Sequence, residues 1–320
     1  MMMSRFALWM CLVGAMTLAV HGVYAQDYPN KPIRIVTAAA GGGSDFDARL
    51  VAQGISGPLG QPVIIDNRAS AVLAAEFVAK APSDGYNLLV AGSVLWTTPL
   101  LRQTPYDAIR DFTPISLIEW TVYLVAVHPS LPAKSVKELI ALAKARPGEL
   151  NYSSTVTGAG NHLAAELFKS MAGVNISRVP YKASAAAVAA LAAGEVQVTI
   201  MDAPSAAPFV KSGRLRSLAV TSAAPSALAP GLPTVSASGL PGYEFVGLTG
   251  MLAPAKTPPA IINRLNQEVV RVLNLPDVKE KLLNIGSEVI GGTPEQFAAA
   301  LKSDVATLSK VIKDAGIKAE

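Results

Sequence analysis

The sequence predicts an α/β fold with mostly parallel sheets, built as two compact domains. Short runs rich in Val, Ile and Leu alternate with helical patterns along the chain after residue 30. Such alternation with short loops is typical of βαβ units, and near-continuous apolar strands are typical of sheets covered on both faces. About 295 residues follow the first 25, a length that favours two compact domains over one.

The first 25 residues have the pattern of a secretory signal peptide. Arg5 precedes an apolar run from Phe6 to Val20, and small residues follow up to Ala25. The run is about 15 residues long, short of the ~20 needed to span a bilayer. We therefore expect cleavage after Ala25 rather than an uncleaved membrane anchor. The single cysteine, Cys11, lies in this segment, so a mature chain without disulfides or thiolate sites suits a bacterial periplasm.

The individual elements follow from local patterns. Strands are predicted at residues 33–37, 63–65, 88–91, 123–127, 151–153, 177–179, 196–201, 215–221 and 244–252. Helical patterns occupy residues 45–59, 74–81, 136–145, 162–172 and 183–193, and a last amphipathic helix follows Thr293. Residues 221–245 are rich in Pro, Ser and Gly and predict a long surface loop.

Three of these helices have recognisable N-terminal caps. Ser44 is the expected cap of the first helix, with Asp47 three residues on as a weaker form of the Ser-x-x-Glu capping box. Ser135 with Glu138 begins a second helix in the same way, and Thr293 followed by proline begins the last one.

Composition and charge argue against several classes of function. Lys and Arg number 27 against 23 Asp and Glu, and they are scattered along the chain. This distribution does not predict a nucleic-acid surface; a pI near 9 indicates only a mild preference for acidic partners. Only two histidines, His128 and His162, follow the predicted signal peptide, and because they lie far apart and no carboxylates cluster, the sequence predicts no metal site.

Catalytic motifs are missing as well. The sequence has no Gly-x-Ser-x-Gly elbow, no Ser-x-x-Lys pair and no His-Glu-x-x-His, and its glycine loops lack the third glycine of a dinucleotide site. His128 has the setting of a turn residue. His162 begins a helix and could pack or cap, line a pocket, or act as a general base. We therefore predict no cofactor and no enzyme.

Three strand-to-helix turns can present bare backbone to a ligand. Glycines 41–43 lack Cβ and so allow close approach, and the first N–H groups of the next helix are unsatisfied and partly positive. Such a turn can hold an anion, although a glycine turn is also the ordinary end of a strand. Similar turns lie in "SSTVTGAGNHLAAELF" (153–168) and "VPYKASAAAV" (179–188). Together they predict a carboxylate site in a cleft between domains.

With these turns in place, the chain resembles the Bug (TctC-like) family, the periplasmic substrate-binding proteins of tripartite tricarboxylate transporters. The resemblance rests on "YPNKPIRIV", "LGQPVIIDNR", "APSDGYNLLV", "YDAIRDFTPISLI", "VHPSLPAKSVKELIALAKARPGELNYSS" and "VPYKASAAA", in family order, and covers about residues 28–317. It implies the type II periplasmic-binding-protein fold: two α/β lobes, two crossing segments near 117–123 and 245–250, and a small carboxylate closed between the lobes.

The same resemblance implies a set of ligand-binding residues. They are Ala39, Ala40, Gly43, Ser44, Asp45, Ser93, Thr157, Gly160, Asn161, His162, Lys182, Ala183, Ser184 and Asp202. Backbone amides and waters hold the ligand in this family, and few side chains are charged. Asp45 could cap the helix, order waters on the ligand, or be a solvated acid of the first turn.

The sequence also departs from the family pattern. "TAAA" replaces a Pro-rich run before the glycines, "ASAVLAAE" after Arg68 is shorter than usual and has no glycine, and Ala183 stands where glycine is usual. These changes alter the pocket wall. They favour a carboxylate with a bulkier or aromatic tail over a small amino acid.

The sequence thus predicts a periplasmic receptor. Lobe one would comprise residues 27–119 and 248–320, and lobe two residues 120–247, after a signal peptide at 1–25. Its expected partners are a small carboxylate and membrane permease subunits, with no nucleic acid, and the chain is expected to be monomeric. A sensor without transport, and a periplasmic enzyme that uses His162, are the alternatives.

Overall fold

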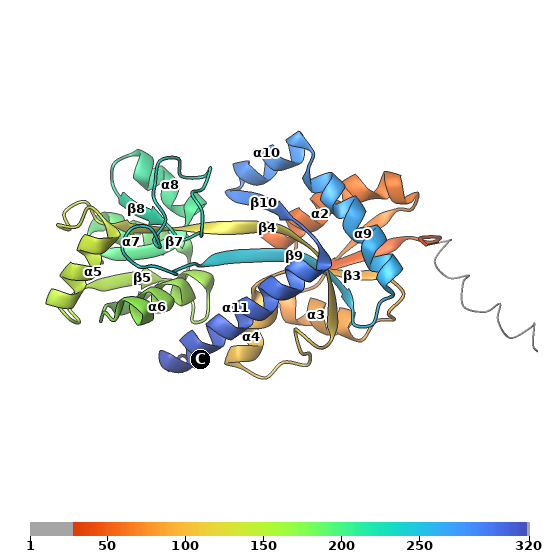
Figure 1. The fold of residues 1–320 in the computed structure, drawn as a ribbon, viewed down its shortest axis with the longest axis horizontal. Coiled ribbons are helices and arrows are strands. Elements are labelled where there is room, and N and C mark those ends of the chain that lie inside the picture. Colours follow the sequence, from red (N-terminus) through yellow and green to blue (C-terminus); the bar gives the residue numbers. More distant parts are fainter. Residues whose placement is uncertain (1–27, 319–320) are drawn as a thin grey trace, which may run out of the picture.

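A computed structural model describes residues 28–318, and the predicted signal peptide lies outside them. Two α/β lobes lie side by side, joined across the middle by the long strands β4 (Phe112–Val127) and β9 (Val246–Pro254) (Figure 1). This is the two-lobed arrangement that the sequence predicts.

The first lobe is a sheet with helices on both faces. Its strands β1 (Ile33–Thr37), β2 (Val63–Asn67) and β3 (Asn87–Gly92) continue into β9 in the order β2-β1-β3-β9. Alternate strand residues face opposite sides. One side packs against α2 (Gly43–Leu59) and α9 (Pro259–Leu273). The other packs against α3 (Ala71–Ala79), α4 (Val94–Leu101) and the start of α11 (Pro294–Asp314).

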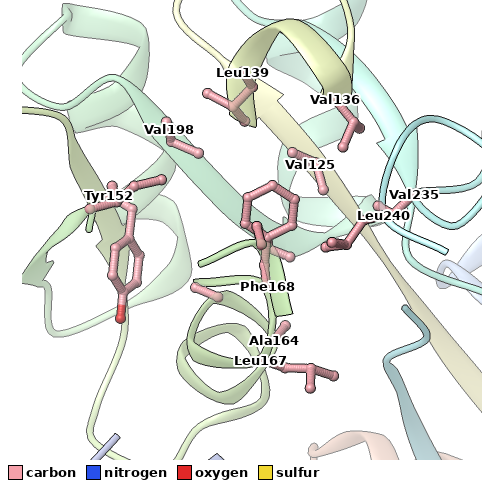
Figure 2. Packing of buried hydrophobic residues seen from close by; sticks show 14 of the residues in the cluster. Val125, Val136, Leu139, Tyr152, Ala164, Leu167, Phe168, Val198, Val235 and Leu240 are labelled. Carbon is pink, nitrogen blue, oxygen red and sulfur yellow. The ribbon is translucent and has the colours of Figure 1, made fainter. Parts of the chain in front are cut away.

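The second lobe repeats this plan. It holds β5 (Asn151–Ser154), β6 (Ser177–Pro180), β7 (Val198–Asp202), β8 (Arg216–Val220), α5 (Val136–Ala145), α6 (Gly160–Ala172), α7 (Ser184–Ala193) and α8 (Ala203–Lys211). Figure 2 shows the ring of Phe168, on α6, pointing toward the side on which Val125 of β4 and Leu139 of α5 lie. The side chain of Phe168 is only 2% exposed, so this ring anchors α6 and the turn before it.

Strand direction changes between the outer and central parts of the sheet. The outer pairs β1–β2, β1–β3, β5–β6 and β5–β7 are parallel, as predicted. The pairs that involve β4 or β9 are antiparallel. Residues Phe112 to Val122 of β4 pair with β9, whereas Tyr123 to Val127 pair with β7. One continuous strand therefore belongs to both lobes.

The predicted strand at 123–127 is thus only the end of a longer one. Polar residues such as Ser116, Glu119 and Thr121 interrupt the apolar pattern of the earlier part, and its partner β9 lies far along the chain. Strand β10 (Ser287–Gly291), after α10 (Pro276–Asn284), pairs with the same part of β4 and was not predicted.

Helix α11 also reaches both lobes. Thr293 caps it as predicted: its hydroxyl accepts from Gln296 N, and Gln296 Oε1 accepts from Thr293 N. Phe297 and Leu301 pack in the first lobe, whereas Leu308 packs with the core of the second. The helix therefore bridges the lobes beside the joining strands (Figure 1).

Two local predictions are corrected by the structure. Helix α2 begins at Gly43 with Gly42 as its N-cap, not with Ser44, because the carbonyl of Gly42 accepts the first helical bonds. Residues 221–245 form a loop, but this loop is partly buried: Val235 and Tyr243 are 0% and 1% exposed. Within residues 28–318, no helix is long and apolar enough to span a membrane.

Candidate functional site

Five turns lead from strands into helices, and two of them, the β3–α4 and β5–α6 turns, border the hollows between the lobes. The carboxyl ends of β1 and β3 in one lobe, and of β5, β6 and β7 in the other, lead directly into α2, α4, α6, α7 and α8. The N-termini of five helices, whose first N–H groups lack partners in the regular helical pattern, therefore follow strands of the two lobes.

In the turn between β1 and α2, the buried side chain of Asp45 holds the backbone through hydrogen bonds. Its Oδ2 accepts from Gly41 N at 2.9 Å and from Arg49 Nε at 3.1 Å, and its Oδ1 accepts from Asn67 Nδ2 at 2.8 Å. Burial alone would raise the pKa of Asp45, but the bonds from Arg49, Gly41 and Asn67 outweigh it and lower the pKa to about 2. Asp45 is 5% exposed, so the interpretation as a solvated acid is wrong.

The rest of this turn offers backbone rather than side chains. Ala39, Ala40 and Gly43 are exposed, and Ser44 is half-buried. Gly41 has φ +84, a left-handed conformation that glycine adopts without strain.

In the turn between β5 and α6, side chains again hold the backbone through hydrogen bonds. Asn161 Oδ1 accepts from Thr155 N at 3.2 Å, and His162 Nδ1 accepts from Gly158 N at 3.1 Å. Burial, together with the nearby charge of Arg178, lowers the pKa of His162 to about 4. The neutral imidazole of His162 is 3% exposed and accepts a hydrogen bond from the backbone. Of the three roles considered for His162, this environment fits packing.

Five further predicted residues lie where strands β6, β7 and β3 end. Lys182 and Ala183 are exposed before α7, which begins at Ser184. Asp202 caps α8 by accepting from Ser205 N at 3.0 Å. Ser93 connects α4 to β9: its Oγ accepts from Leu248 N at 3.0 Å and donates to Leu248 O at 3.3 Å.

Two adjoining hollows lie between the lobes. A cavity of about 180 Å³ includes Ser93 and Gly160 in its lining, and a groove of about 390 Å³ between α4 and the β5–α6 turn includes Thr157. These three predicted residues therefore come together. Neither hollow is lined by the other eleven: Ala39, Ala40, Gly43, Ser44, Asp45, Asn161, His162, Lys182, Ala183, Ser184 and Asp202.

The cavity of about 180 Å³ is also lined by residues that the sequence did not single out. Thr121 and Tyr123 of β4, Thr249 of β9 and Asp304 of α11 line it. The predicted crossing segments 117–123 and 245–250 contain the first three, so that prediction could have led to them. Asp304 lies on α11 and had no signal in its local sequence.

A buried pair of carboxyl groups lies behind this cavity. Asp47 of α2 and Glu119 of β4 are 1% and 5% exposed. Burial raises the pKa of both groups, and the nearby Glu119 raises that of Asp47 further. Asp47 Oδ1 and Glu119 Oε2 have no hydrogen-bond partner among the described residues. No group of three or more His, Cys, Asp or Glu side chains in residues 28–318 could hold a metal ion.

The fold and its cleft define a class: a two-lobed solute-binding protein of the type II periplasmic-binding-protein architecture. The family model described as the tripartite tricarboxylate transporter family receptor (TctC) matches residues 47–317. The chain belongs to that family.

Curated and structural relatives agree with this assignment. The chain is 33% identical to the protein BugT of Bordetella pertussis over 302 residues, 92% of this chain and 93% of BugT. Rpa4515 of R. palustris, solved with adipate, is 39% identical with a TM-score of 0.72 over 92% of this chain and 100% of that one. MatC of Rhodopseudomonas palustris, solved with bound malate, is 27% identical with a TM-score of 0.68 over 89% and 100%.

Proposed function

We propose that this protein is a periplasmic solute receptor, which captures a small carboxylate between its lobes and delivers it to a tripartite tricarboxylate-type transporter. The observation that carries the proposal is the pair of backbone-rich turns, β3–α4 and β5–α6, that begin helices beside the hollows between the lobes. The receptor binds its ligand without a cofactor and catalyses no reaction. It acts as a monomer, and its membrane partners are the permease subunits.

The chemistry of the turns supports a carboxylate. Exposed backbone N–H groups at a helix N-terminus donate to an anion in a partly positive field. Hydrogen bonds to a charged group contribute about 1.5–3 kcal/mol each. Two or three of them, set against the cost of ordering a ligand, bring micromolar binding within reach.

The relatives support the same class of ligand. Rpa4515 was solved with adipate and MatC with malate, both small carboxylates. Their similarity spans about nine tenths of this chain. The family, described as the receptor of tripartite tricarboxylate transporters, supports the transport role.

The moving parts would be lobe one (residues 27–119 and 248–320) and lobe two (residues 120–247). Strand β4 pairs with β9 in one lobe and with β7 in the other. Bending of β4 and β9 at this junction would let the lobes close on a ligand. The ligand shifts this equilibrium only by its better affinity for the closed form.

An apolar wall supports a ligand with a bulky or aromatic tail. Val94 and Val156 are 55% and 63% exposed, yet both line the groove beside Leu101. An apolar tail laid along this groove would cover side chains that otherwise face water.

A thermal-shift screen of unfolded and refolded mature protein tests the proposal, because refolding removes any copurified ligand. Carboxylates with one, two and three acid groups, aromatic acids, phosphate and sulfate are compared. We expect a selective rise in melting temperature with one class of carboxylate, and a larger rise with an aromatic acid than with succinate. If the melting temperature rises only with phosphate or sulfate, the proposal that the ligand is a carboxylate is wrong.

A pair of lysine variants checks where the ligand binds. Lys182→Gln at the third turn should weaken carboxylate binding. Lys211→Gln, at the far end of α8, removes the same charge from an exposed position of the same lobe and should leave binding unchanged. Equal effects of the two variants would place the ligand elsewhere.

A further inference from the structure

Arg178 on β6 holds the β5–α6 turn with every nitrogen of its side chain. Its Nε donates to Ser154 Oγ at 2.8 Å, its Nη1 to Thr157 Oγ1 at 3.0 Å and its Nη2 to Thr155 O at 2.7 Å. All three acceptors lie within four consecutive residues, 154–157. Because the guanidinium group is planar and rigid, three bonds from it fix the positions of these atoms relative to one another.

The register of the sheet explains how Arg178 reaches this turn. Arg178 pairs with Tyr152 of β5, so its hydrogen-bond partners lie further along the chain, toward α6. Each residue of a parallel strand advances about 3.3 Å, and the long arginine side chain runs forward past the end of β5. It therefore links the last strand in the order of the second lobe to the turn that precedes α6.

This turn is the part of the second lobe that lines both hollows. Gly158 and Ala159 line the cavity and the groove alike, and Thr157 lines the groove. Arg178 itself lines neither hollow. It can therefore act on a ligand only through the turn and through its charge.

The positive charge of Arg178 has no acidic partner in the part of the chain that the structure describes. Its three acceptors are two hydroxyl groups and a carbonyl, and none of the ion pairs among residues 28–318 includes it. The carboxylate of Glu166 on α6 is paired with Lys169 Nζ at 2.7 Å and accepts from the Tyr152 hydroxyl at 2.6 Å. The charge of Arg178 therefore adds to the positive end of the α6 dipole.

We infer that Arg178 is the positioning residue of the anion site. Its three hydrogen bonds hold the β5–α6 turn in the conformation that opens the N-terminus of α6 to the hollows, and its charge attracts the carboxylate toward that end. This inference rests on the proposed function, and it assigns part of the affinity to a residue that does not touch the ligand.

Hydrogen exchange tests the effect on the turn without any ligand. In Arg178→Gln, the amides of residues 155–160 should exchange about tenfold faster than in the wild type, because the bonds that hold the turn are lost. The control is Arg216→Gln. Arg216 also donates three hydrogen bonds in the second lobe, to carbonyls within residues 129–133, which line neither hollow. It should leave exchange at 155–160 unchanged, and unchanged exchange in Arg178→Gln would overturn the inference.

Calorimetric titrations with the carboxylates of the thermal-shift screen, adipate and benzoate among them, test the effect on affinity. Arg178→Gln should bind the same carboxylate about tenfold more weakly than the wild type. Arg216→Gln should lose a similar amount of stability and keep the wild-type affinity, which separates a role at the site from a loss of stability alone. Equal affinities of Arg178→Gln and the wild type would overturn the inference. If no carboxylate of the screen binds the wild type, the proposed function fails, whereas hydrogen exchange still decides whether Arg178 holds the turn.

Arg178→Lys separates the charge from the geometry. Lysine keeps the charge but lacks the planar fork, so exchange at residues 155–160 should stay fast while the affinity recovers in part. The recovered part should shrink between about 0.05 and 0.5 M NaCl, because mobile ions screen the charge. If Arg178→Lys binds no better than Arg178→Gln at low salt, the inferred attraction by charge is wrong.

Ser154→Ala covers the case in which Arg178→Gln does not fold. It removes the acceptor of Arg178 Nε and keeps every charge. Exchange at residues 155–160 should rise, and the affinity should fall about threefold. Unchanged exchange and affinity in a folded Ser154→Ala protein would overturn the inference.

Discussion

Asp45 holds the first turn in shape through three hydrogen bonds, so it contributes to stability as well as to the site. Asp45→Asn keeps the shape of the side chain but removes the charge that strengthens the bonds from Gly41 N and Arg49 Nε. We expect the free energy of unfolding to fall by about 1–3 kcal/mol, measured by urea denaturation at pH 7. Because the folded pKa is lowered, this contribution is present above about pH 4 and is lost as pH falls toward 2.

The control for this variant is Asp277→Asn. Asp277 makes an exposed i,i+4 pair with Lys281 on α10, with side chains 64% and 50% exposed. Such pairs contribute about 0.3–0.5 kcal/mol, so the loss should be small. Equal losses in the two variants would contradict the role of Asp45.

The Asp47–Glu119 pair should give the opposite dependence on pH. Burial and the neighbouring carboxyl raise the folded pKa of Asp47, so between about pH 4 and its raised value the folded state holds a proton that the unfolded state has released. Stability from this site is therefore highest at low pH and falls as pH rises. Urea midpoints from pH 5 to 8 should decline less in Asp47→Asn than in the wild type, and parallel curves would contradict this.

At the scale of elements, Gly158 shows how closely the two lobes approach at the β5–α6 turn. It has φ +81, and a Cβ built there would clash with Leu101 Cδ1 of α4. Gly158→Ala should therefore lower stability by about 1–3 kcal/mol through backbone strain and crowding, and it should weaken ligand binding because α4 and the turn are pushed apart.

Thermal unfolding and ligand titration of the same variant measure the two effects, with Gly57→Ala as the control. Nothing lies within 4 Å of a Cβ at Gly57 in α2, and its φ is ordinary. That substitution should raise stability by up to about 0.5–1 kcal/mol. If Gly158→Ala changed neither the stability nor the ligand affinity, the β5–α6 turn would be free to move.

Elements with local signals were predictable from the sequence, and elements defined by distant partners were not. β1 and α5 have the predicted bounds, and Ser135 caps α5 by accepting from Glu138 N. Most of β4 was missed because its pairing with β9 comes from residues more than a hundred positions away. The β5–α6 turn that lines the cavity could be predicted from its glycines in the sequence. Thr249 and Asp304, by contrast, reach the cavity only through tertiary folding, so their local sequence did not predict them.

Across the whole molecule, β4 and α11 connect the two cores. Leu308 is 1% exposed in the second lobe, on the helix whose Phe297 packs in the first. Leu308→Ala should cost about 2–5 kcal/mol through the cavity it leaves. Because the lobes share these elements, calorimetry should show a single transition moved to lower temperature.

Leu283→Ala on α10 provides the control, since Leu283 is 41% exposed and its truncation should change little. Two separate transitions, of which only one moves in Leu308→Ala, would show that the lobes unfold independently.

The shared strand also limits how the protein can be divided. A cut between Val122 and Tyr123 would leave each half with a fragment of β4. Each separately expressed half would then carry a shortened edge strand with unpaired N–H and C=O groups, a template for aggregation. Biosensor designs that insert a reporter domain should therefore avoid β4 and β9, and use an exposed loop such as the one around Gly213, where a Cβ would meet nothing within 4 Å.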